Sequence, residues 1–203
     1  MTDYFALLQT PRRPWVDGEK LKENFQSLAT RVHPDRLHGA DDSTRQNAAR
    51  QYAELNEAYL CLRESKSRLQ HLLRLERGSK PGDTNLLPES LMQLFSQVGP
   101  LLREADLLLK EKGLAGSAVQ RALITANSLP CMERISAMQD ELNKQKDRLD
   151  AELHSIDADW VARGQGTDEH SSLLAQCERL YHHLGFLDRW ITQLRARSLE
   201  LTL

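Results

Sequence analysis

The fold is decided by the stretch 21–62, LKENFQSLATRVHPDRLHGADDSTRQNAARQYAELNEAYLCL, in which His33-Pro34-Asp35 separates two helical patterns. The pattern before the tripeptide has apolar residues at steps of four, three and four, which is typical of an amphipathic helix: Leu21, Phe25, Leu28 and Val32. Pro34 ends this helix, because proline lacks an N–H donor and disfavours helical geometry in the residue before it.

A second helix is predicted after the tripeptide. Ser43 and Gln46 have the S-x-x-Q spacing of a capping box, which marks a helix start. One face of that helix is apolar and consists of Ala48, Tyr52, Leu55, Tyr59 and Leu62. Because the polar loop between the two helices is short, each apolar stripe is buried against the other. The stretch is therefore predicted to form an antiparallel helical hairpin with a polar tip.

The segments on either side of the hairpin are also helical. Asp3–Leu8 predicts a short turn or helix that Pro11 and Pro14 end. Asp17 is a candidate N-cap for the first long helix. After the hairpin a shorter helix is indicated by Leu69, Leu72 and Leu73, and the Gly- and Pro-containing sequence RGSKPGDTN at 77–85 is typical of a linker. We expect a domain at 1–77, a linker at 78–87 and a helical C-terminal domain at 88–203.

The C-terminal part reads as helix throughout. Gly99-Pro100 is expected to interrupt or kink the first of these helices, Ser117 can cap a further one, and Pro130 begins or bends a long helix that reaches about Ala162. The last two helices carry apolar residues every seven positions. The main series are Ile135, Leu142, Leu149 and Ile156, followed by Leu173, Leu180, Leu187, Leu194 and Leu201. The Gly164-Gln165-Gly166 turn is short enough to fold these helices back on each other, so the fold class is all-α, with a compact antiparallel bundle.

Composition narrows the possible partners. The chain has 203 residues, 40% of them hydrophobic, and its 27 basic and 29 acidic residues give a net charge near −2. Such a balance favours neither nucleic acid nor an anionic membrane as a partner. No stretch reaches the roughly 18 apolar residues of a membrane span, and the N-terminus lacks the pattern of a signal peptide. We expect a cytoplasmic protein.

The reactive residue types do not form a recognisable site. Cys61, Cys131 and Cys177 are far apart and odd in number, which predicts buried thiols rather than disulfides or a metal centre. His38, His182 and His183 lack the spacing of zinc ligands, so no metal or other cofactor is expected. The chain also lacks a Gly-rich phosphate loop, a nucleophile elbow and paired catalytic carboxylates. We therefore expect a protein that is not an enzyme.

The first seventy-odd residues resemble the J-domain, the module of DnaJ-type co-chaperones. The resemblance is carried by Asp3-Tyr4-Phe5-x-Leu7-Leu8, the helix LKENFQSLATRV, the loop His-Pro-Asp-Arg at 33–36, and the helix ARQYAELNEAYLCL. It implies an all-helical domain that binds a DnaK-type chaperone and stimulates ATP hydrolysis by that chaperone. The J-protein itself hydrolyses nothing.

The resemblance also assigns the chaperone-binding residues. These are His33, Pro34, Asp35, Lys22, Arg31 and Arg36. Pro34 presents Asp35 rigidly, so little entropy is lost when its carboxylate pairs with an arginine of the partner. The three cations add attraction to an acidic surface, mainly in association rate and orientation. Gln26 and Ser27 occupy positions that are commonly basic in the family, which implies weaker docking or a specialised chaperone partner.

The C-terminal part resembles the HscB family, the co-chaperones of iron-sulfur cluster assembly. The similar segments are Leu184-Gly185-Phe186-Leu187-Asp188-Arg189 and Ser90-Leu91-Met92, and the region 99–130 is longer than usual for that family. The resemblance implies a client-binding patch for the cluster scaffold protein, made of Leu91, Met92, Phe95 and Phe186. At this helical spacing, plain core packing is the competing interpretation.

The sequence also allows a function other than that of a co-chaperone. The chain could be a helical adaptor or coiled-coil assembly protein whose J-like domain is degenerate, as the uncharged Gln26 and Ser27 suggest. Such a protein would not stimulate an ATPase. It would self-associate through its C-terminal helices, along the seam from Leu173 to Leu201.

Overall fold

The computed structural model describes residues 2–33, 41–82, 87–163 and 168–203. The described residues form helices and connecting segments without any β-strand, which confirms the predicted all-α class. They divide into two compact units, one of Met1–Gly82 with Ala151–Tyr181 and one of Asp83–Asp150 with His182–Leu203. The domain boundary expected at 78–87 stays a prediction. The two long C-terminal helices contribute residues to both units.

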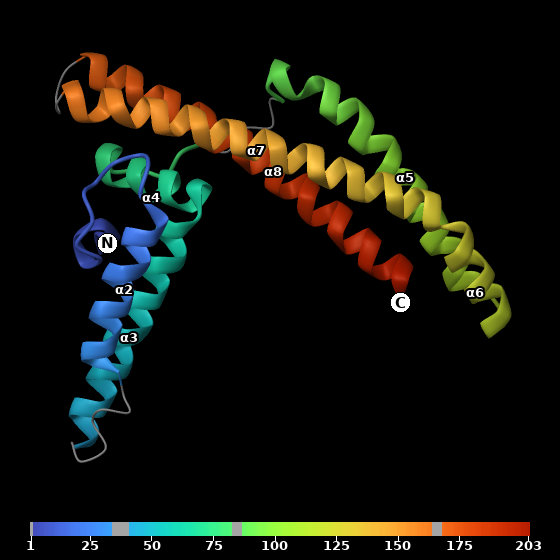
Figure 1. The fold of residues 1–203 in the computed structure, drawn as a ribbon, viewed down its shortest axis with the longest axis horizontal. Helices are drawn as coiled ribbons and strands as arrows, with labels where there is room; N and C mark the ends of the chain where they lie inside the picture. Colours follow the sequence, from blue (N-terminus) through green and yellow to red (C-terminus); the bar gives the residue numbers. More distant parts are fainter. Residues whose placement is uncertain (1, 34–40, 83–86, 164–167) are drawn as a thin grey trace. The chain divides into compact units, whose positions relative to one another are not determined.

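The first unit contains the predicted hairpin (Figure 1). Its elements are α1 (Tyr4–Leu7), α2 (Gly18–Val32), α3 (Asp42–Arg63) and α4 (Ser65–Arg77). Helices α2 and α3 lie side by side and antiparallel, with the rings of Phe25 and Tyr59 stacked at 4.6 Å between centroids. Leu21, Leu55 and Leu62 are buried, as their spacing predicted. The predicted N-cap of α2 is confirmed, since the Asp17 carboxylate accepts hydrogen bonds from two backbone N–H groups of the first turn.

The start of α3 corrects one prediction. The N-cap is Asp41 and not Ser43, and the helix begins at Asp42. The Asp41 carboxylate accepts a hydrogen bond of 2.8 Å from the backbone N–H of Thr44 and another of 2.6 Å from the Ser43 hydroxyl. Ser43 is therefore a donor to the cap, because a carboxylate two residues earlier provides the stronger acceptor for the exposed N–H groups.

The connection between α1 and α2 is anchored by a buried carboxylate. Asp157, in α7 (Leu129–Arg163), is almost fully buried and is held by the guanidinium of Arg13, with Nε at 2.8 Å from Oδ1 and Nη2 also in contact. The backbone N–H of Trp15 donates to the same Oδ1 at 3.3 Å, and the Trp15 ring meets His154 edge-on. This pairing satisfies the buried charge, which would be costly if left alone.

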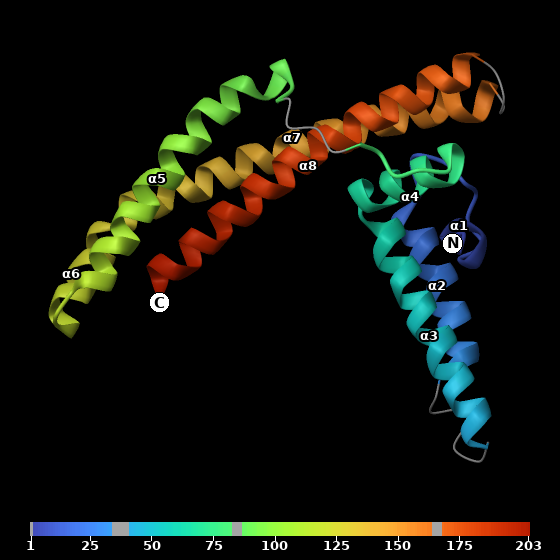
Figure 2. The same cartoon turned by 180° about the vertical axis from the view of Figure 1, so that it is seen from behind.

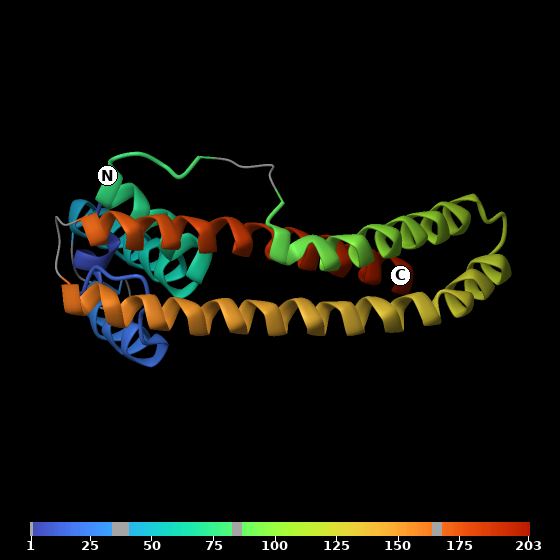
Figure 3. The ribbon, with the colours of Figure 1, turned by 90° about the horizontal axis from the view of Figure 1, so that it is seen from above.

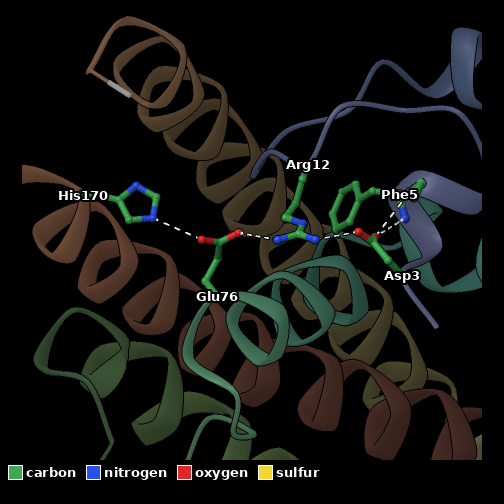
Figure 4. A network of polar contacts seen from close by, with 6 residues as sticks. Asp3, Phe5, Arg12, Glu76 and His170 are labelled. Atoms are coloured by element: carbon green, nitrogen blue, oxygen red, sulfur yellow. Dashed lines mark hydrogen bonds and ion pairs between the residues drawn. The ribbon is translucent and has the colours of Figure 1, made fainter. Parts of the chain in front are cut away.

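A chain of polar contacts fixes the base of the hairpin (Figure 4). Arg12 lies between two carboxylates, with Nη2 at 2.7 Å from Asp3 and Nη1 at 3.3 Å from Glu76 of α4. Glu76 is in turn 3.3 Å from Nε2 of His170, which belongs to α8 (Asp168–Thr202). Asp3 also accepts the backbone N–H of Phe5 and so caps α1. The network joins α1, α4 and α8 within the first unit.

The second unit is a group of helices (Figures 2 and 3). These helices share one apolar core. Its elements are η2 (Glu89–Leu91), α5 (Met92–Leu114), α6 (Ala118–Asn127) and parts of α7 and α8. Helix α5 continues through Gly99-Pro100, so the expected interruption is wrong, while the alternative of a kink stays a prediction. Ser117 caps α6 as predicted, because its hydroxyl accepts the Gln120 N–H at 3.2 Å.

The heptad residues of α7 and α8 face the interior. All five leucines of the α8 series, from Leu173 to Leu201, are at most 3% exposed, and Ile135 and Leu142 of α7 are fully buried. Lys146 of α7 and Asp188 of α8 form an ion pair of 2.7 Å beside this core. The seam is thus filled by contacts within one chain, which confirms the predicted antiparallel packing of the last two helices.

Candidate functional site

The predicted chaperone-binding tip begins at the end of α2. The helix ends at Val32, as the following proline predicted, and His33 is its C-cap in an extended conformation. The His33 ring meets the Tyr52 ring of α3 edge-on, with 5.3 Å between the centroids. Pro34, Asp35 and Arg36 lie outside the described residues. The structure therefore places one residue of the tripeptide, packed between the two helices of the hairpin.

The structure separates two of the predicted cations. Lys22 and Arg31 are both exposed on α2, but nine residues correspond to about two and a half helical turns. They consequently lie on opposite flanks of the helix. Lys22 shares its flank with Gln26, one turn further along, and with His33 at the helix end. Arg31 lies on the other flank, away from His33.

An open groove lies on the Lys22 flank, beside the tip. It has a volume of about 360 Å³ and is lined by Phe25, Gln26, Ala29, Thr30, His33 and Tyr52. Ala29 is buried and the rings of Phe25 and Tyr52 are half-buried, whereas Gln26 and Thr30 are exposed at the rim. The groove exists because a small residue, Ala29, lies between larger ones. This groove was not among the predicted sites, although large and small residues alternate on this face of α2 in the sequence.

The predicted client patch consists of both exposed and buried residues. Met92 and Phe95 of α5 are 57% and 53% exposed, whereas Leu91 is 4% and Phe186 is 9% exposed. Leu91 and Phe186 belong to the core of the second unit. Phe95 and Phe186 both approach the Trp190 ring, at 6.2 and 6.0 Å between centroids. Phe95 and Phe186 thus meet at Trp190, and of the four predicted residues Met92 and Phe95 are the exposed ones.

The cysteines are in environments that keep thiols protonated. Burial raises the pKa of Cys177 to about 12 and that of Cys61 to about 11, and it also raises the pKa of Cys131. All three are free thiols. Only Cys131 and Cys177 are fully buried, while Cys61 is half-buried. A raised pKa lowers the fraction of thiolate, which is the nucleophilic and metal-binding form.

The described residues contain neither a metal site nor a membrane span. Among these residues, His, Cys, Asp and Glu side chains do not gather in any group of three or more that could hold a metal ion. The described helices are also too polar or too short for a bilayer, so none of them is a candidate membrane span. The predicted functional features among the described residues are His33 with its groove and the surface of Met92 and Phe95.

A comparison with protein-family models decides the nature of the first region. Residues 3–71 match the DnaJ domain. These residues form a J-domain. The match includes α1, the α2–α3 hairpin with its tripeptide, and part of α4, so the predicted resemblance of the first seventy-odd residues is confirmed. In this J-domain, His33 at the end of α2 is the first residue of the His-Pro-Asp sequence at 33–35.

The chain is also similar in sequence to HscB co-chaperone proteins. The chain is 36% identical over 93 residues to a co-chaperone protein HscB homolog of Azoarcus sp. (strain BH72), which covers 45% of this chain and 52% of that protein. It is 36% identical over 74 residues to the HscB homolog of Vibrio cholerae serotype O1 (strain M66-2), covering 36% of this chain and 43% of that one. The chain thus matches about half the length of these relatives.

The fold extends the likeness beyond the J-domain. The crystal structure of human co-chaperone protein HscB superposes with a TM-score of 0.62 and covers 97% of this chain and 82% of the human one. The sequence identity is 15%, so this comparison concerns the fold alone. The helices that follow the J-domain therefore adopt an arrangement similar to that of a solved HscB protein.

Proposed function

We propose that this chain is a co-chaperone that stimulates ATP hydrolysis by a DnaK- or HscA-type chaperone in the cytoplasm. The observation that carries the proposal is the J-domain at 3–71, with His33 at the end of α2 and Pro34 and Asp35 directly after it. The chain itself is not an enzyme in this proposal. It acts by binding, and the ATPase belongs to the partner.

The physical role of the tip follows from its chemistry. Asp35 supplies a carboxylate for an arginine of the chaperone, and Pro34 limits the conformations that the backbone loses on binding. The His33 ring contacts Tyr52 of α3, so the residue that precedes Pro34 packs against the hairpin. Lys22, Arg31 and Arg36 are the proposed cations, and the exposed positions of Lys22 and Arg31 suit a role in attracting an acidic surface.

The test is a single-turnover ATPase assay with HscA and DnaK in parallel. The wild-type chain should accelerate hydrolysis, and Asp35→Asn should lower the acceleration by about tenfold or more, because hydrogen bonds to charged groups contribute about 1.5–3 kcal/mol. Asp42→Asn, at the exposed start of α3, is the matched control and should retain the acceleration. Equal stimulation by wild type and Asp35→Asn would remove the basis of the proposal.

We further propose that the C-terminal helices bring a client, an iron-sulfur cluster scaffold. This part is supported by the HscB-like segments in the sequence and by the exposed apolar side chains of Met92 and Phe95. Exposed large apolar residues that lie together often mark protein–protein contact. Leu91 and Phe186 would support that surface from below, through the core and Trp190.

The alternative of a coiled-coil assembly protein depends on a free apolar seam. In the second unit Leu187, Leu194 and Leu201 are fully buried within the chain. Self-association along this seam would require the helices to separate first, which would expose the core. Light scattering over a range of concentrations tests this alternative, and the co-chaperone proposal expects no association through the seam.

A further inference from the structure

A pocket of about 220 Å³ lies between the first turns of α2 and the connection that precedes them, at the opposite end of α2 from His33. Its lining includes Arg13, Trp15 and Lys20. We propose that this pocket binds a carboxylate that is joined to one compact apolar group, such as an aromatic ring or a branched side chain. The site is separate from the chaperone-binding tip, and the inference does not depend on the proposed function.

The inner part of the pocket is apolar and small. Leu21 is 1% exposed, and Trp15 and Val16 are half-buried. An apolar cavity of about 150 Å³ can hold benzene, so about 220 Å³ is enough for one ring together with a carboxylate. Pockets for larger ligands have volumes of about 300–1,000 Å³. The size therefore limits the occupant to a single compact group.

The polar groups that remain available at the pocket are donors. Lys20 is exposed, and its ammonium forms no ion pair with any residue that the structure describes. Arg13 holds Asp157 through Nε and Nη2, which leaves Nη1 as a further donor. The Asp17 carboxylate already accepts the backbone N–H groups of Glu19 and Lys20, at 3.0 and 3.2 Å. Cationic donors beside an apolar floor favour an anion with an apolar part.

Contacts behind the pocket hold its walls in place. The side-chain amide of Asn24 donates to the carbonyl oxygens of Leu8 and Gln9, at 3.1 and 3.3 Å, which joins the end of α1 to α2. The Trp15 ring meets the His154 ring edge-on, with 4.6 Å between the centroids. Walls that are already fixed lose little conformational entropy when a ligand binds. The pocket is therefore prepared for a ligand before binding.

Gln9 contributes a further donor from an unusual backbone position. Its φ of 52° lies in the left-handed region that favours glycine, and such a position directly after a helix is most often a glycine. A residue with a side chain persists there only where its surroundings hold the backbone. The Gln9 side chain lines the pocket, so its amide can donate to the bound carboxylate.

The test is a titration of the full chain with N-acetyl-L-phenylalanine, followed by NMR at the indole N–H of Trp15. This probe carries a ring and a carboxylate, and it mimics the last residue of a polypeptide. We expect saturable binding with a Kd of about 1 mM, because a ligand of this size makes few contacts. The uncharged N-acetyl-L-phenylalanine amide should bind about tenfold more weakly, since it lacks the charge-assisted hydrogen bonds.

Two variants with matched controls locate the binding. Lys20→Met removes the cation and should weaken binding about five- to tenfold, whereas Lys110→Met, at an exposed lysine of α5 outside the pocket, should bind like the wild type. Val16→Trp fills the pocket and should abolish saturable binding, and Ala53→Trp, at an exposed position of α3, should not. Helix content and melting temperature are measured for every variant, so that the exposed Lys20→Met carries the test if Val16→Trp does not fold.

A second probe identifies the source of the carboxylate. Phenylpropionate has the ring and the acid but lacks the acetamido group. Equal binding of both acids supports a free small carboxylate as the ligand, and stronger binding of the acetylated probe supports the end of a polypeptide. Equal binding of the acid and its amide, or equal affinity of wild type and Lys20→Met, would overturn the inference. Stimulation of a chaperone ATPase through Asp35 would stand in either case, because the pocket lies at the other end of α2.

Discussion

The α2–α3 hairpin and the α7–α8 pair are both antiparallel helices with apolar stripes, yet their proposed functional residues occupy different places. In the hairpin the described members Lys22 and Arg31 are exposed on α2, away from the apolar stripe. In the C-terminal helices Leu91 and Phe186 belong to the apolar core itself. A motif placed apart from the packing pattern can be read from sequence, whereas a binding patch that continues the core cannot be separated from it.

The largest expected effect comes from truncating a buried member of the predicted client patch and comparing it with an exposed member. Phe186→Ala should lower the free energy of unfolding by about 3 kcal/mol, because it leaves a cavity in a packed core. Met92→Ala should change it by less than about 0.5 kcal/mol, since that side chain is mostly exposed. Urea denaturation followed by circular dichroism measures both values. Equal effects would show that the patch is uniform and that the distinction between its members is wrong.

A slightly smaller effect is expected at the buried carboxylate of the first unit. Arg13→Met removes the partner of Asp157 and leaves a buried charge, which typically costs 3–5 kcal/mol. Because the Arg13 side chain is about one-third exposed, we expect a loss of about 2 kcal/mol. The control is Arg197→Met, which breaks the more exposed pair with Asp106 and should cost less than about 1 kcal/mol. Chemical denaturation would contradict the account if the two variants were equally stable.

Truncation of an exposed residue of the proposed client patch should lower the affinity for the scaffold and leave the stability of the fold unchanged. Phe95→Ala should weaken binding of a purified iron-sulfur scaffold by about tenfold, as expected for an exposed aromatic contact. Leu199→Ala, an equally exposed apolar residue of α8, is the control and should leave binding unchanged. Isothermal titration calorimetry measures both. Unchanged binding by Phe95→Ala would place the client elsewhere.

The smallest effect concerns the start of α3, close to the tip. Hydrogen bonds from Ser43 and Thr44 lower the pKa of Asp41 to about 2, from an ordinary value of 3.8. A carboxyl group with a lowered pKa stabilises the folded state above its unfolded pKa and loses that contribution as the pH falls through its folded pKa. Asp41→Ala should therefore speed amide exchange of Thr44 at pH 6. The difference from the wild type should shrink between about pH 4 and pH 2.

Hydrogen exchange measured by NMR at several pH values checks this prediction. Asp42→Ala is the control, because Asp42 does not accept the Thr44 N–H in the structure. A Thr44 amide that exchanges equally fast in the wild type and in Asp41→Ala would mean that Asp41 is not the cap.

The positions of most helices could be predicted from apolar spacing and proline positions. The residue that caps a helix could not always be predicted. Pro34 correctly predicted the end of α2, since its effect on the preceding residue is steric and local. The start of α3 was wrong, because Asp41 and Ser43 are both good caps and the sequence does not rank them in their tertiary setting. Similarly, α5 continues through Pro100, where the loss of one hydrogen bond is tolerated within a packed helix.

Contacts between residues far apart in the chain could not be predicted from the sequence. The network from Asp3 through Arg12 and Glu76 to His170 joins three helices, and no local pattern indicates which charges will meet. The separation of Lys22 from Arg31, in contrast, follows from helical geometry alone and could have been predicted. The groove required the structure, because it depends on Tyr52 of α3 facing Ala29 of α2.

The most direct test of the central claim is the single-turnover ATPase rate of HscA or DnaK with wild-type chain and with Asp35→Asn. The account predicts clear acceleration by the wild type and a loss of about tenfold or more in the variant, with unchanged helix content. Acceleration that is absent, or that is the same with both proteins, would contradict the claim that the hairpin tip acts on a chaperone ATPase.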